Sequence, residues 1–189
     1  MKIQTLAFIA TLAVASGAHA ATAGQPPATV ASVDLERYAG TWYEVARFPN
    51  RFQDQCVGDV TATYAQRADG RIDVTNRCRT REGKVDEAAG IARPAGGDKT
   101  GAKLEVRFAP AILSFLPFVW GDYWVLGLGP EYDWAVVGDP GRDYLWILAR
   151  APEVSEAVRA QAESIAKANG FDVGRLITTA QGQASASTR

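Results

Sequence analysis

The chain has 189 residues, of which 47% are hydrophobic, and its formal net charge at pH 7 is −1. This length accommodates one domain with a substantial core but hardly two. The sequence lacks a basic run and a stripe of interleaved aromatic and basic residues. Its composition therefore argues against nucleic acid as a partner.

Residues 1–20 have the pattern of a secretory signal peptide. Lys2 supplies the positive end, an apolar run follows, and "AHA" at residues 18–20 matches a small-x-small cleavage site. The mature chain would begin at Ala21, where a bacterial lipoprotein would carry an acylated cysteine. We therefore expect an exported protein that is not acylated, lies in the periplasm, outside the cell or peripherally at the outer membrane, and has no transmembrane helix.

Cleavage would also remove His19, which is the only histidine. A mature chain without imidazole excludes Ser-His-Asp and Cys-His catalytic arrangements and all histidine metal sites. The serines beyond the signal stand in no nucleophile motif. We therefore expect no catalytic residue, no metal and no cofactor.

In chain order, residues 21–33 are small, polar and proline-containing, which is typical of a mobile leader. Residues 34–180 form the predicted domain, and residues 181–189 a disordered tail. Within the domain, short runs of β-branched, aromatic and alternating residues are separated by Gly, Pro and Asp clusters. The predicted strands are those at 41–48, the two of a hairpin within 60–78, and those at 84–92, 103–108, 121–128, 133–138 and 143–149.

These strands predict an all-β, eight-stranded up-and-down antiparallel barrel, which removes both sheet edges and can enclose one small ligand. One segment differs from the rest. Residues 152–170 space their apolar side chains at helical intervals and end in Asn169-Gly170, a good helix C-terminus. We expect this C-terminal α-helix to pack outside the barrel and residues 170–179 to add a short final strand.

Three separated motifs give the chain a strong resemblance to the lipocalins, specifically to the branch of bacterial lipocalin (Blc) and apolipoprotein D. "GTWYEVARF" begins at Gly40 and matches the family's G-x-W. "GPEYDWAVV" keeps only Tyr132 of the family's T-D-Y, and "DYLWILAR" ends in Arg150 as the family's third motif ends in an arginine. The resemblance covers residues 34–177 and implies a lipocalin β-barrel.

An antiparallel meander brings the first strand's start, the turn with Tyr132 and the last barrel strand's end to the same end of the barrel. We expect Trp42 to plug that end, with Arg150 lying across its indole face and donating to nearby carbonyls. Gly40, Trp42, Tyr132 and Arg150 are thus predicted to close the barrel rather than to bind a ligand.

If Trp42 points inward, strand alternation also turns Glu44 and Ala46 inward and places Arg47 on the other face. Glu44 would then be a carboxylate in an apolar barrel, either a contact for a ligand's polar group or a hydrogen-bonded structural acid. The barrel could also be packed solid, but small residues such as Ala88 and Gly90 favour a cavity. The predicted ligand-binding residues are Glu44, Ala62, Tyr64, Val74, Asn76, Val106, Phe108, Trp120, Tyr123, Val125 and Trp146.

Residues 109–121 would join two strands at the open end of the barrel and hold too many apolar side chains for an ordinary exposed loop. They could contact a membrane surface, form a homodimer interface or fold over the barrel as a lid.

Cys56 and Cys78 are the two cysteines of the chain, and in an exported protein we expect them to form a disulfide. A regular hairpin turning at Asp69-Gly70 would place Cys56 opposite residues 81–83. The bond therefore requires a bulge or an irregular segment in this hairpin.

The leading hypothesis is a binding protein that holds a fatty acid, a lysophospholipid or a similar amphipathic lipid in its barrel, for membrane maintenance or lipid transfer. One alternative is a lipocalin-fold enzyme of the isomerase type, which the missing histidine disfavours. Another is a membrane or protein interaction module that uses residues 109–121.

Overall fold

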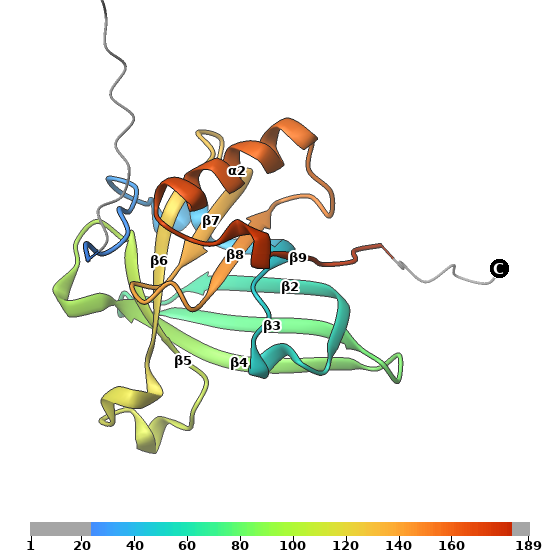
Figure 1. Ribbon diagram of the computed structural model, residues 1–189. Coiled ribbons are helices and arrows are strands. Elements are labelled where there is room, and N and C mark those ends of the chain that lie inside the picture. The colour runs from blue at the N-terminus through green and yellow to red at the C-terminus, as the bar shows by residue number, and fades with distance from the viewer. Residues whose placement is uncertain (1–23, 183–189) are drawn as a thin grey trace, which may run out of the picture.

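The computed structural model describes residues 24–182, and the predicted signal peptide and most of the predicted tail lie outside them. A barrel of antiparallel strands forms the centre of the molecule (Figure 1). Each strand pairs with the next along the chain, and β1 pairs with both β2 and β8, which closes the barrel as predicted. The strands are β1 (Gly40–Arg47), β2 (Cys56–Gln66), β3 (Ile72–Thr80), β4 (Val85–Pro94), β5 (Lys103–Arg107), β6 (Gly121–Leu128), β7 (Trp134–Gly138) and β8 (Leu145–Ala149).

The helix α2 (Glu156–Ala168) packs outside the barrel, against β6 and β7 (Figure 1). Ser155 caps its start by accepting a hydrogen bond from a backbone N–H of the first turn, and Gly170 follows its end with a φ of +83°. Ala162 and Ala166 are buried against the barrel wall. No helix in the described part of the chain is long and apolar enough to cross a membrane.

The C-terminal segment after α2 completes the barrel wall. Strand β9 (Ile177–Thr178) is the predicted final strand, and it pairs with the part of β1 that β2 does not reach. Gln181 then donates from Nε2 to the carbonyls of Glu44 and Val60, both at 2.8 Å, and so bridges β1 and β2. Gln181 was predicted to belong to a disordered tail, but its side chain fills the gap between two diverging strands.

The described part of the predicted leader, residues 24–33, also packs against the barrel. Val33 is 6% exposed and donates from its backbone N–H to the carbonyl of Thr100 at 2.7 Å. Val30 donates in the same way to Val125 at 2.9 Å. These residues were expected to form a mobile leader, but they are held against the barrel. The Ala28 N–H also donates to Asn169 Oδ1 at 2.7 Å, and Arg142 Nη2 donates to the carbonyl of Gln25 at 2.8 Å.

The predicted disulfide between Cys56 and Cys78 is present, with 5.5 Å between the two Cα atoms. The pairing of β2 with β3 shifts register between Cys56 and Gly58 and again between Gly58 and Thr61. These shifts are the irregularity that the sequence requires for this bond.

The short helices are α1 (Leu35–Tyr38), η1 (Arg51–Gln53), η2 (Ala95–Gly97), η3 (Ala111–Leu113), η4 (Pro117–Val119) and η5 (Val173–Arg175).

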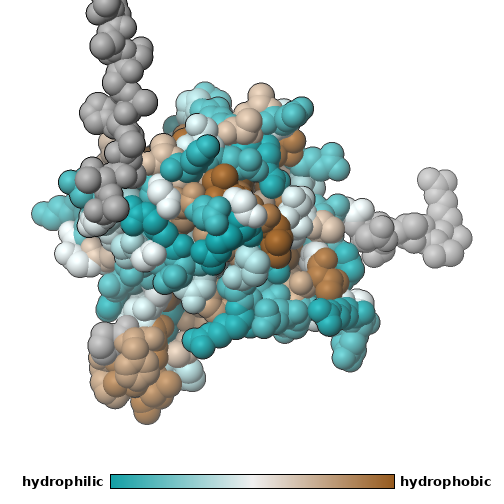
Figure 2. Space-filling view, in the orientation of Figure 1, coloured by the Kyte–Doolittle hydropathy of each residue, from teal (hydrophilic) through white to brown (hydrophobic). Residues whose placement is uncertain are grey.

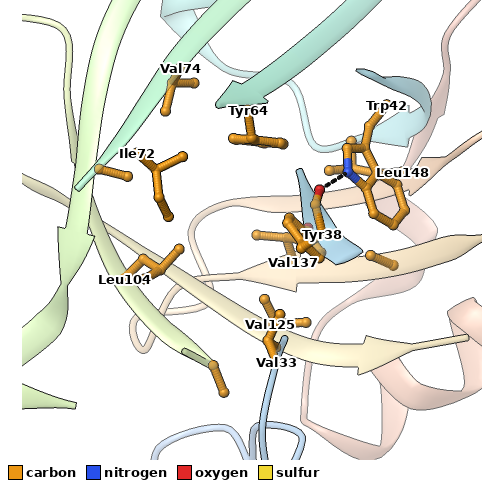
Figure 3. Close-up of a cluster of buried hydrophobic side chains, with 13 residues drawn as sticks. Val33, Tyr38, Trp42, Tyr64, Ile72, Val74, Leu104, Val125, Val137 and Leu148 are labelled. Carbon is orange, nitrogen blue, oxygen red and sulfur yellow. Dashed lines mark hydrogen bonds between the residues drawn. The ribbon is translucent and has the colours of Figure 1, made fainter. Parts of the chain in front are cut away.

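Trp42 closes one end of the barrel, at the base of its inner core (Figure 3). Its side chain is fully buried, and its Nε1 donates to the backbone carbonyl of Tyr38 at 2.8 Å. The guanidinium carbon of Arg150 lies 3.9 Å from the centroid of the Trp42 ring. The expected cation-π contact is therefore present.

Arg150 uses all three of its nitrogens to tie this end together. Nε donates to the carbonyl of Tyr132, Nη1 to that of Thr41, and Nη2 to those of residues 37–39. Gly40 has a φ of +94°, and a Cβ there would lie only 3.3 Å from Nη1. The closed end thus depends on one planar guanidinium group that donates to carbonyls of two segments, residues 37–41 and the turn at Tyr132.

We expect the variant Arg150→Lys to lower the free energy of unfolding by about 3 kcal/mol, because an ammonium group cannot reach all these carbonyls at once. Urea unfolding at pH 7 measures this change. The matched control is Arg67→Lys, since Arg67 forms an exposed ion pair with Asp73, and we expect it to cost less than about 0.5 kcal/mol. Equal stability of the two variants would contradict the role given to Arg150.

Candidate functional site

The inner face of the barrel carries all of the predicted ligand-binding residues except Trp120. Glu44, Asn76 and Phe108 lie on this face toward the open end, which is the end opposite Trp42. The others belong to the inner core or pack against it: Ala62, Tyr64, Val74, Val106, Tyr123, Val125 and Trp146.

The half of the barrel next to Trp42 is filled by side chains (Figure 3). Tyr38 enters it from α1 and lies with its hydroxyl 2.8 Å from that of Tyr123, which is also 2.9 Å from the hydroxyl of Tyr64. Burial raises the pKa of Tyr64 to about 12 and raises the pKa of Tyr38 and Tyr123 above the usual value. The three phenols therefore remain un-ionised. Strand alternation could not reveal Tyr38, because it comes from a helix.

In the half toward the open end, some inward-facing apolar side chains are exposed to solvent. Ala88 pairs with Asn76 on the inner face and is nevertheless exposed to solvent. Phe108 is 43% exposed, and a Cβ on Gly90 would lie 2.7 Å from Cδ1 of its ring, so the missing side chain of Gly90 leaves room for the phenyl group. Inward-facing apolar groups that solvent reaches indicate that this part of the interior is open.

Strand β1 contains a bulge that changes which residues face inward. Glu44 pairs with Leu148, but Ala46 pairs with the next residue along, Ile147, so Val45 has no counterpart in β8. Ala46 is therefore buried in the outer core under α2, and Arg47 faces inward. The predictions that Ala46 faces inward and that Arg47 cannot share a face with Glu44 are both wrong, because alternation restarts after the extra residue.

Glu44 is 3% exposed and accepts hydrogen bonds on both carboxylate oxygens. Arg47 Nη1 lies 3.3 Å from Oε1, Gln53 Nε2 lies 2.7 Å from Oε2, and the hydroxyl of Thr179 also donates to Oε1. Burial raises the pKa of Glu44, and these donors oppose that effect. Because every one of these partners donates, the hydrogen bonds fit the ionised carboxylate.

A second set of hydrogen bonds joins this cluster to the barrel wall. Gln53 Oε1 accepts from Trp146 Nε1 at 3.1 Å and from Asn50 Nδ2 at 2.7 Å. Strand alternation did not predict that Arg47 faces inward, because it follows the bulge in β1. It could not find Gln53 or Thr179 either, because these residues lie outside the eight barrel strands. Within residues 24–182 no group of three or more His, Cys, Asp or Glu side chains is arranged to hold a metal ion.

Trp120 does not line the interior. Its ring lies against the guanidinium groups of Arg93 and Arg107, whose carbons are 3.9 Å and 5.3 Å from the ring centroid. These arginines alternate with the inward residues Ala92 and Val106, so they lie on the outer face. The prediction that Trp120 binds a barrel ligand is corrected, because the chain folds back outside β4 and β5, where cation-π contacts hold the indole.

The segment between β5 and β6 forms a projecting apolar lobe, residues 111–119 (Figures 1 and 2). Ile112, Phe115 and Phe118 are 79%, 75% and 79% exposed. The sequence from Phe108 to Gly121 contains no charged residue. An uncharged and strongly apolar surface therefore stands beside the open end of the barrel.

Comparison with known proteins places this geometry in a family. The family model described as a lipocalin-like domain matches residues 33–181. Temperature-induced lipocalin-1 of Arabidopsis thaliana is 41% identical, over 80% of this chain and 81% of that protein. The outer membrane lipoprotein Blc of Escherichia coli K12 is 38% identical, over 95% and 98% of the two chains. Apolipoprotein D of Mus musculus is 28% identical, over 96% and 94%.

Solved structures share the fold at lower sequence identity. Insecticyanin of the tobacco hornworm Manduca sexta has a TM-score of 0.64 and 20% identity, over 85% of each chain. Lobster apocrustacyanin A1 has a TM-score of 0.62 and 18% identity, over 85% of this chain and 93% of that one. With its barrel, its motifs and these relatives, the chain belongs to the lipocalin-like family.

Proposed function

We propose that this protein binds an amphipathic lipid, a fatty acid or a lysophospholipid, inside its barrel and carries it without catalysing a reaction. The observation that carries the proposal is the open half of the interior, where Ala88 and Phe108 face inward and are still exposed. An acyl chain would cover these groups and lie against Ala62 and Val106. The name of one relative, apolipoprotein D, supports an association with lipids.

We also propose that the protein is exported through its signal peptide and lies in the periplasm, outside the cell or peripherally at the outer membrane. The Blc relative is named as an outer membrane lipoprotein. Ala21 takes the position where acylation would need a cysteine, so the proposed contact with a membrane is not through a covalent lipid.

The apolar lobe supports a second part of the proposal, a direct contact with a lipid surface. Trp120 donates from Nε1 to the carbonyl of Ser114 and stacks on Arg93, so the base of the lobe is fixed to the barrel. The exposed side chains at its tip would insert between lipids, and their position beside Phe108 would let a lipid pass between membrane and barrel.

Filling the open half of the barrel should block lipid binding. The variant Ala88→Trp places a large ring on the inner face, and we expect it to weaken binding of a fluorescent fatty acid by at least about tenfold, since the ring occupies the space of the acyl chain. The matched control is Ala89→Trp, because Ala89 is also exposed but points to the opposite face. Equal affinities of the two variants, or no binding of any acyl chain to the unchanged protein, would contradict the proposal.

Removing the apolar tip should release the protein from membranes. We expect the double variant Phe115→Ser and Phe118→Ser to lose co-flotation with vesicles of phosphatidylethanolamine and phosphatidylglycerol but to keep binding a fatty acid in solution. The control is Val85→Ser, which removes an apolar side chain that is 71% exposed on β4. If the double variant floats unchanged and instead loses a dimer seen by analytical ultracentrifugation, the lobe is a homodimer interface and the membrane contact is wrong.

A further inference from the structure

The apolar lobe is attached at its base to two arginines on the outer face of the barrel. The ring of Trp120 lies 3.9 Å from the guanidinium carbon of Arg93 and 5.3 Å from that of Arg107. Its Nε1 donates to the backbone carbonyl of Ser114 at 2.9 Å, and Ser114 directly precedes the exposed Phe115. A single indole ring therefore separates the guanidinium groups from the apolar part of the lobe.

Arg93 is the more accessible of the two arginines. Its side chain is 46% exposed, whereas Arg107 is 7% exposed as a whole residue. Arg93 binds the Glu105 carboxylate through Nε at 3.0 Å and Nη2 at 2.9 Å. Its third nitrogen, Nη1, has no hydrogen-bond partner among the described residues. An exposed guanidinium with an unused nitrogen can take a second anionic acceptor.

The arginines at the base of the lobe carry more charge than the acids beside them. Glu105 balances Arg93, but Arg107 donates to a backbone carbonyl rather than to a carboxylate. The next charged residues on this face are Asp122, which pairs with Glu105 across the strands, and Lys103, which precedes Glu105 by two residues. These two have opposite signs, so an excess of positive charge remains next to an uncharged lobe.

Insertion of the lobe would bring this positive base to the level of the lipid phosphates. At a membrane surface, apolar side chains enter the acyl region, indole rings lie among the headgroups, and cationic groups stay in contact with water and phosphate. Phe115 and Phe118 would take the first position, Trp120 the second and Arg93 the third. A phosphate oxygen is also an acceptor that suits a guanidinium group.

We propose that Arg93, held on the ring of Trp120, binds the phosphate of an anionic phospholipid, and that the lobe therefore prefers bilayers of net negative charge to neutral bilayers. The inference rests on the proposed membrane contact and specifies the kind of lipid surface that makes it. Glu105 limits the preference, because its carboxylate competes with the phosphate for Arg93 and repels it.

Co-flotation with two kinds of vesicle tests this preference, one of phosphatidylcholine alone and one of phosphatidylcholine mixed with phosphatidylglycerol. We expect the unchanged protein to bind the mixed vesicles about fivefold more tightly at low salt, since each basic side chain near an anionic surface contributes about this factor. High salt should remove most of the difference, because it screens the attraction.

The variants Arg93→Gln and Glu105→Gln should shift the preference in opposite directions. Arg93→Gln removes the phosphate contact, so we expect it to weaken binding to the mixed vesicles by about fivefold and to change binding to neutral vesicles by less than about twofold. Glu105→Gln removes the competing charge and should tighten binding to the mixed vesicles by about threefold. A purely structural role for this ion pair would weaken both variants on both kinds of vesicle.

The matched control is Arg77→Gln. Arg77 forms an ion pair of the same kind with Glu87, between β3 and β4, and we expect its loss to change neither affinity by more than about twofold. Circular dichroism reports whether each variant is folded. If Arg93→Gln does not fold, Glu105→Gln and the salt dependence of the unchanged protein still decide the question.

Equal binding of the unchanged protein to neutral and mixed vesicles would overturn this inference and leave the membrane contact intact. A loss in Arg77→Gln as large as that in Arg93→Gln would also overturn it, because the preference would then reflect overall charge. If the unchanged protein binds neither kind of vesicle, or forms a dimer through the lobe instead, the proposed membrane contact fails together with this inference.

Discussion

Strand β1 must find hydrogen-bond partners on both of its edges, and much of this structure follows from how it does so. One edge pairs with β8, while the other pairs with β2 only from Gly40 to Tyr43. Beyond Tyr43 the segment after α2 takes the place of β2, through β9 and the bridging side chain of Gln181. In this way both edges of β1 are paired and the barrel closes, although β1 and β2 diverge.

The same arrangement builds the polar cluster. The bulge at Val45 turns both Glu44 and Arg47 inward, and the segment that replaces β2 brings Thr179 to the carboxylate. A buried ion pair of this kind is seldom kept for stability, because desolvation offsets most of its attraction. The pair is held in place by further hydrogen bonds to the Glu44 carboxylate from Gln53 and Thr179.

The two ends of the barrel serve different purposes. At the closed end, Trp42, Arg150 and the tyrosines leave few polar groups unsatisfied and fill the interior with large side chains. At the open end, the inward apolar residues Ala88 and Phe108 are exposed, and the apolar lobe projects beside them (Figure 2). The closed end is thus densely packed with large side chains, whereas the open end leaves apolar groups in contact with solvent.

Periodicity and turn signals in the sequence determined the eight strands and the outer helix. The contact of Trp42 with Arg150 followed from the order of the strands and the family motifs, and the disulfide from the presence of two cysteines in a chain predicted to be exported. The facing of Arg47, the outward position of Trp120 and the anchoring of Val33 were decided only by the tertiary structure. Alternation assumes an unbroken pleat, whereas the bulge in β1 is set by register with β8, about a hundred residues further along the chain. The arginines that hold Trp120 and the carbonyl that binds Val33 likewise come from segments that only folding brings near.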